Sequence, residues 1–117
     1  MLQLELVSPE RMLVSEEVDE VLLPGLDGYL GVLPGHAALL SALKPGVLRY
    51  RKGSAERVVA VYGGFVEVRD DRVRVLADAA QPREEINIEL AREELRKINP
   101  DSIEELARAQ ARLDAAL

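Results

Sequence analysis

The sequence predicts a mainly β domain with a C-terminal helical part: an N-terminal β-sandwich over residues 1–82, then an antiparallel two-helix hairpin over residues 83–117. Three observations support this fold. Short segments with apolar residues at alternate positions fill residues 2–77, separated by turn signals. After Pro82 the chain contains no Gly, Val, Tyr or Phe and is rich in helix-forming Glu, Arg, Ala and Leu. The segment 99–102, Asn-Pro-Asp-Ser, divides this region in two.

Six strands are expected in the N-terminal part. The first shows the clearest period, because Leu2, Leu4 and Leu6 alternate with polar residues, as in a half-buried strand. Residues 58–61 are apolar at every position, which predicts burial on both faces in the middle of the sandwich. Gly63-Gly64 is expected to interrupt a strand, and Asp70-Asp71 to form a turn. The expected strands are residues 2–6, 18–23, 47–51, 56–62, 65–69 and 73–77, with 52–54 as a hairpin turn.

Two amphipathic helices are expected after the sandwich. The first has an apolar stripe, spaced 3, 4 and 3 residues, formed by Ile88, Ala91, Leu95 and Ile98. Ser102 and Glu105 have the spacing of a capping box at the start of the second. That helix has a heptad-like seam of Ile103, Leu106, Gln110, Leu113 and Leu117. Neither stripe is wide, and Ala91, Ala107 and Ala111 offer little area, so the hairpin is expected to dock weakly on the sandwich.

Composition excludes several classes of function. The chain has 117 residues, enough for one compact domain, and a net charge of −6, which argues against a nucleic-acid partner. Cysteine is absent, so disulfides, thiolate metal sites and thiol nucleophiles are excluded. No apolar run reaches the length of a membrane span, and no signal pattern begins the chain, which predicts a soluble protein. Residues 1–43 are acidic and residues 44–74 basic, which suggests two faces with different neighbours.

No catalytic centre emerges from the residues. His36 is the only histidine, and no serine and acid are spaced to form a hydrolytic triad with it. The glycines around it lack the spacing of a phosphate-binding loop, so residues 28–36 are better explained as a shaped surface turn for protein contact. No calcium-loop spacing is present, and no metal ligand is assigned. Arg108 and Arg112 are four residues apart and share one helix face, which suits either a solvated surface or an acidic partner.

Five motifs in order make the chain similar to the epsilon subunits of F-type ATP synthases. They are Val7-Ser8-Pro9-Glu10, residues 28–40 (GYLGVLPGHAALL), residues 42–46 (ALKPG), residues 63–68 (GGFVEV) and residues 73–78 (VRVLAD). The resemblance covers essentially the full length. It implies a non-catalytic central-stalk subunit, with a β-sandwich followed by a helical hairpin, that couples rotation of the c-ring to the catalytic head.

The resemblance also implies partners and site residues. The sandwich, residues 1–82, is expected to bind the gamma subunit and the c-ring, with Tyr29, Leu30, Gly31, Pro34 and His36 in the contact loop. Tyr29 stands where many bacterial relatives carry glutamate. The hairpin, residues 83–117, is expected to extend transiently toward the alpha and beta subunits and inhibit ATP hydrolysis, with Arg108 and Arg112 facing an acidic segment of beta. The expected location is the cytoplasmic face of the bacterial plasma membrane, peripheral and through the complex alone.

Two alternatives remain open. Some bacterial relatives bind ATP through Ile/Leu-Asp-x-x-Arg-Ala, and this chain has Ile88-Glu89-Leu90-Ala91-Arg92-Glu93. Glu89 and Arg92 would form such a site, but the extra acid at Glu93 disfavours a triphosphate, so no cofactor is expected and nucleotide binding would be weak at most. From another class, a small β-sandwich hydrolase or a sugar- or ligand-binding domain would require a concave polar pocket around His36.

Overall fold

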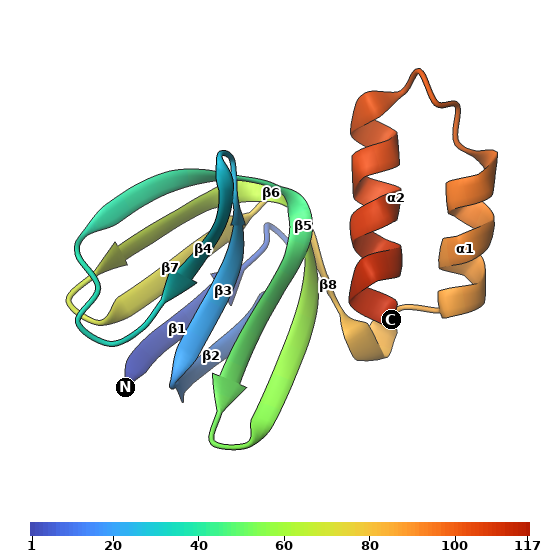
Figure 1. Ribbon diagram of the computed structural model, residues 1–117. Coiled ribbons are helices and arrows are strands. Elements are labelled where there is room, and N and C mark those ends of the chain that lie inside the picture. Colours follow the sequence, from blue (N-terminus) through green and yellow to red (C-terminus); the bar gives the residue numbers. More distant parts are fainter.

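Eight strands and two α-helices form the fold of the computed structural model, which describes residues 1–117 (Figure 1). The strands are β1 (Leu2–Val7), β2 (Met12–Val18), β3 (Glu20–Gly25), β4 (Gly28–Val32), β5 (Leu39–Lys52), β6 (Ala55–Arg69), β7 (Arg72–Ala77) and β8 (Ala80–Pro82). A short 3₁₀ turn, η1 (Arg83–Glu85), leads to α1 (Ile88–Lys97) and α2 (Ile103–Ala116). The predicted β-sandwich followed by a helical hairpin is confirmed, and the last strand ends at Pro82.

The two long strands β5 and β6 belong to both layers of the sandwich. The strand order is β2-β1-β7-β6-β5-β3-β4, and β8 pairs with the first half of β6. Gly63 and Gly64 lie where β6 leaves β8 and begins to pair with β7, and both have a positive φ, of 90° and 131°. A Cβ on Gly64 would lie 2.2 Å from the Leu76 carbonyl oxygen, so only glycine fits. The expected interruption is therefore wrong, because the glycines redirect the strand without ending it.

The inner faces of the two layers form the main core. Eighteen buried residues contribute, among them Leu2, Leu4 and Leu6, which have no exposed surface. The alternation predicted for the first strand is therefore confirmed. Apolar burial of this extent is the main source of stability for a chain of this size.

A second, smaller cluster lies between the sheet and α2. It contains Val47 of β5, Val58, Ala60 and Tyr62 of β6, and Ala111 and Ala115 of α2. Residues 58–61 are thus buried on both faces as predicted, but their outer face is covered by a helix and not by a second sheet. Figure 1 shows α2 between the sandwich and α1.

The helices differ in detail from the sequence pattern. The apolar stripe of α1 is confirmed, with Ala91 buried and its three partners half-buried. The cap prediction is wrong: the Ser102 side chain accepts no capping hydrogen bond, whereas Asn87 caps α1 by accepting from the Leu90 N–H at 3.1 Å. The seam of α2 is also wrong at its ends, where Ile103 and Leu117 are 79% and 67% exposed. The buried residues of α2 are alanines, because methyl groups let the helix approach closely.

Several strands escaped prediction. Residues 12–18, 28–32, 39–46 and 80–82 are extended, although turn residues or irregular polarity hide their alternation. The expected hairpin at 52–54 and turn at 70–71 are present, each as a two-residue loop. Asp70 and Asp71 both have a positive φ, of 50° and 58°, which suits the tight turns of β-hairpins.

Candidate functional site

A fixed turn after β4 presents part of the predicted contact loop. Gly35 has a φ of 85°, and the His36 N–H donates to the Leu33 carbonyl at 3.2 Å. The Gly35 N–H donates to Asp71 Oδ1 at 2.7 Å, which ties this turn to the β6–β7 hairpin. Leu33 and Pro34 are exposed and His36 is half-buried. The result is a rigid apolar projection at one end of the sandwich, the shape expected of a protein contact.

The structure separates Tyr29 from that turn. Tyr29 lies near the start of β4, opposite Pro24 of β3, and its hydroxyl accepts from the Val47 N–H at 3.1 Å. The β3–β5 register is irregular between Leu22 and Gly25, so this hydroxyl satisfies a strand N–H at the point of irregularity. A shallow hollow joins Tyr29 to Asp114 and Leu117 at the end of α2. Tyr29 therefore faces the helix side of the molecule.

The other two predicted loop residues are strand residues. Leu30 pairs with Leu23 and is half-buried against the main core, and Gly31 is exposed opposite Leu22. Of the five residues, Pro34 and His36 thus share the turn, while Tyr29, Leu30 and Gly31 lie along β4. Their roles in partner binding stay predictions.

An exposed apolar row, which sequence reasoning missed, lies on the outer face of β5, β6 and β7. Leu40, Phe65 and Leu76 are 73%, 57% and 53% exposed, and Phe65 and Leu76 are direct cross-strand partners. Charged residues flank the row, with Glu67 opposite Leu40 and an Arg74–Glu5 ion pair of 3.4 Å beside it. The available signal was the outward parity of Phe65 and Leu76, which alternate with the buried Val66 and Val75.

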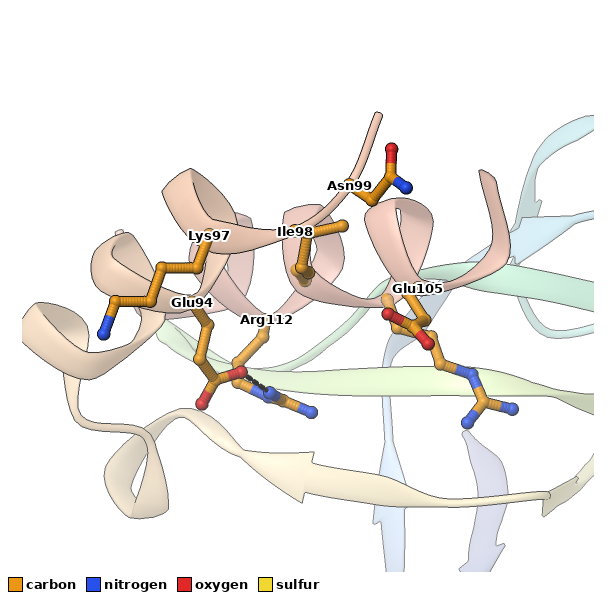
Figure 2. A pocket seen from close by; sticks show the side chains of 8 residues that line it. Glu94, Lys97, Ile98, Asn99, Glu105 and Arg112 are labelled. Atoms are coloured by element: carbon orange, nitrogen blue, oxygen red, sulfur yellow. Dashed lines mark hydrogen bonds and ion pairs between the residues drawn. The ribbon is translucent and has the colours of Figure 1, made fainter. Parts of the chain in front are cut away.

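The opposite outer face of the sandwich is covered by α2. A cleft of about 460 Å³ opens between the two helices, and Arg108 and Arg112 both line it (Figure 2). Arg112 forms an ion pair with Glu94 of α1, drawn as a dashed line in Figure 2. Arg108 forms no ion pair or hydrogen bond. The structure therefore brings the two predicted arginines together, one engaged and one free.

Glu89 and Arg92 lie on another side of the hairpin. They line a separate groove on α1 and pair with each other at 3.7 Å across one helical turn. The carboxylates of Glu89 and Glu93 both border this groove. The two arginines of the groove, Arg92 and Arg96, already pair with these carboxylates, so no uncompensated positive charge is left for a phosphate group, and nothing in the groove replaces the missing backbone cradle.

The link between sandwich and hairpin is held by specific polar contacts. Arg11, in the β1–β2 turn, pairs with Glu85 of η1 at 2.6 Å; this hydrogen bond lowers the pKa of Glu85. Arg83 Nε donates to the Ala115 carbonyl at 2.8 Å and thereby satisfies an acceptor in the last turn of α2. Gln81 Nε2 donates to the Glu85 carbonyl at 3.2 Å. These contacts fix the direction in which the hairpin leaves β8.

Features expected of an enzyme are not found around His36. Its Nδ1 lies 2.7 Å from the carbonyl of its neighbour Ala37, and it lines none of the main surface hollows. No three His, Asp or Glu side chains gather as a metal site. None of the helices is both long enough and apolar enough to span a membrane. The hydrolase and ligand-binding alternative therefore lacks the pocket it requires.

Comparisons with known proteins agree with this geometry. Residues 1–83 match the family described as ATP synthase, Delta/Epsilon chain, beta-sandwich domain. An ATP synthase epsilon chain of Solibacter usitatus is 50% identical over 127 residues, covering 98% of this chain and 95% of the relative. The epsilon chain of Desulforamulus reducens is 49% identical over 90 residues, 77% of this chain and 68% of the relative.

Solved structures share the fold. A chain in the Euglena gracilis mitochondrial ATP synthase (OSCP/F1/c-ring) superposes with a TM-score of 0.69 at 24% identity, covering 98% of this chain and 76% of that one. A chain in the Tetrahymena thermophila mitochondrial ATP synthase (central stalk/c-ring) gives 0.74 at 15% identity, covering 99% and 96%. At these identities the likeness concerns the fold alone.

Proposed function

The chain belongs to the ATP synthase delta/epsilon family, as a non-catalytic epsilon-type subunit of the central stalk, and we propose how its surfaces divide the work. Residues 1–82 bind the gamma subunit and the c-ring, and residues 83–117 regulate ATP hydrolysis. The complex lies on the cytoplasmic face of the bacterial plasma membrane, and this chain associates with the membrane only through it.

The proposal that gamma binds to the sandwich rests on the exposed apolar row. One outer face of the sandwich is closed by α2, whereas Leu40, Phe65 and Leu76 expose large side chains on the other. Clustered apolar side chains with charged neighbours are typical of protein contacts. A partner that covers this row would remove Phe65 and Leu76 from water together, which makes them the anchors of the interface.

Binding to gamma tests this assignment. Phe65→Ser in the full chain should weaken association with gamma from the same source by roughly 10-fold or more, since buried aromatic anchors are often worth about 2 kcal/mol. Leu26→Ser is the matched control, because Leu26 is equally exposed but lies in the β3–β4 turn. Equal affinity of the two variants for gamma would refute the assignment, and failure of the unmodified chain to bind would refute gamma binding altogether.

The turn at residues 33–36 is the proposed contact with the c-ring. Its backbone is fixed by Asp71, so an exposed apolar tip is presented without loss of loop entropy on binding. Since the chain has no cysteine, His36→Cys places a single thiol in this turn. In the assembled complex it should cross-link to the ring, whereas Lys52→Cys, at the far end of β5, should not. The reverse pattern would place the ring at the other end.

The hairpin is the proposed brake on ATP hydrolysis. When extended, Arg108 and Arg112 would face an acidic segment of the beta subunit, and the contact would gain from charge complementarity. Arg108→Gln should relieve inhibition of the catalytic head, because Arg108 has no intramolecular partner to lose. Arg96→Gln is the control, because it removes the same charge from an exposed position on α1, where Arg96 pairs with Glu93. A chain ending at Pro82 should not inhibit, and equal inhibition by the full and shortened chains would exclude the hairpin.

A further inference from the structure

Tyr62 is the polar centre of the contact between the sandwich and the hairpin. It lies in β6 at the edge of the second apolar cluster and is buried. Its hydroxyl donates to Gln81 Oε1 of β8 at 3.2 Å and accepts from Arg112 Nε of α2 at 3.0 Å. Both hydrogen-bonding capacities of a buried hydroxyl are thus used, one toward the sandwich and one toward the hairpin.

Arg112 completes the contact from the helix side. Its guanidinium carbon lies 5.1 Å from the centre of the Tyr62 ring, within the range of a cation–π interaction. The same guanidinium forms an ion pair with Glu94 of α1, so one side chain connects both helices to the sheet (Figure 2). Although partial burial disfavours its charge, the hydrogen bonds with Tyr62 and Glu94 raise the pKa of Arg112. The side chain therefore stays charged in this position.

The apolar part of the docking contact is small. The α2 side of the cluster consists of Ala111 and Ala115, each with a single methyl group. Area burial by methyl groups gives little specificity of position, whereas a hydrogen bond from a charged donor is directional and stronger than a neutral one. Two such bonds position α2: Arg83 of η1 donates to the Ala115 carbonyl, and Arg112 donates to Tyr62. Of the two, only the Arg112–Tyr62 bond joins α2 directly to the sheet, so docking on the sheet depends heavily on it.

We propose that Tyr62, Arg112 and Glu94 form a latch that holds the hairpin on the sandwich and sets how often it leaves. In the docked state the latch occupies Arg112, so this cation becomes available only on release. The inference concerns the isolated chain and does not depend on the proposed function. If subunit binding failed, the latch would still be measurable in the chain alone.

Amide hydrogen exchange of the full chain tests the latch. Tyr62→Phe keeps the ring in the apolar cluster and removes only the hydroxyl, so the fold is retained. Helices of this length are marginal once undocked, so release exposes their amides to exchange. Exchange in α2 should accelerate roughly 10-fold, equivalent to about 1.4 kcal/mol, while the amides of β1 and β7 keep their rates. Arg112→Gln should do the same, and Arg108→Gln, one turn earlier, should not.

The outcomes are distinct. Faster exchange confined to the helices supports the latch. Unchanged exchange in α2 overturns it, and so does equal acceleration in helices and sandwich, which would make Tyr62 an ordinary packing residue. The double variant Tyr62→Phe/Arg112→Gln should match Arg112→Gln alone, because Arg112 is the one hydrogen-bond partner of the Tyr62 hydroxyl on the hairpin; additive effects would mean that the two residues act separately.

Discussion

Enlarging Ala111 should release the hairpin without disturbing the sandwich. Ala111 is 3% exposed and packs in the cluster with Val47, Val58 and Tyr62. Ala111→Leu adds three carbon atoms where no space exists, and overpacking of this kind costs about 1–3 kcal/mol. The strain can be relieved by undocking, because the hairpin as a whole packs against the sandwich on one side only.

The expected rise in the undocked fraction follows from the free energy of docking. The methyl groups of Ala111 and Ala115 contribute roughly 0.8 kcal/mol each, and the sheet side chains they cover contribute a similar amount. With the Arg112 contact, docking amounts to on the order of 4 kcal/mol, so about one chain in a thousand is undocked. A cost of about 2–3 kcal/mol raises that fraction to several per cent or more.

Spin-label distances measure this fraction. Because the chain has no cysteine, Lys52→Cys and Glu104→Cys provide two unique sites, one on the sandwich and one at the tip of the hairpin. Ala111→Leu should add a second, longer and broader distance. Gln110→Leu, an exposed position on the same helix, is the control and should keep the single distance. A single unchanged distance with Ala111→Leu would refute the packing estimate.

Three further results are expected. Gly64→Ala should destabilise the chain by at least about 3 kcal/mol in urea unfolding, since its Cβ would collide with backbone at a positive φ; a loss below about 1 kcal/mol would contradict this. Burial raises the pKa of Tyr62 and raises that of Tyr50 to about 12, so ultraviolet titration should show two late tyrosines. Since the pKa of Tyr50 exceeds the unfolded value near 10, the stabilisation is complete below pH 10 and lost as the pH rises through about 12; no late tyrosine would refute it. Calorimetry with millimolar ATP should show no binding heat, because Glu89 already pairs with Arg92; saturable heat would establish a nucleotide site.

Local chemistry made part of this fold predictable. Leu2, Leu4 and Leu6 alternate because one face of their strand is buried, and the composition change after Pro82 marks the helices. The strand β4 was hidden, because its glycines suggest a turn, whereas the segment forms a hairpin with the preceding strand β3. Ser102 shows the same limit, since a capping sequence forms its bond only when the backbone before the helix permits it.

The contact surfaces were less predictable, because they depend on what covers each face. Alternation with the buried Val66 and Val75 places Phe65 and Leu76 on the outward side of their strands. Alternation cannot tell whether an outward residue is covered, as Val58 is by α2, or left in water, as Phe65 is. Tyr62 was missed for the same reason: its partner Arg112 is 50 residues away and meets it only through docking.

The asymmetry of the two outer faces suits the proposed division between partner binding and regulation. The face with large apolar side chains, Leu40, Phe65 and Leu76, is uncovered and suits a stable partner, because burial of such groups is worth several kcal/mol. The other face is closed by alanines, the latch and the Arg83–Ala115 hydrogen bond, a contact that a competing surface can break. If α2 carried leucines in place of Ala111 and Ala115, and the sheet were shaped to receive them, the hairpin would stay docked permanently. The division between the two faces would then be lost. Weak packing under α2 is therefore a requirement of a movable hairpin, and the latch supplies the specificity that the methyl groups lack.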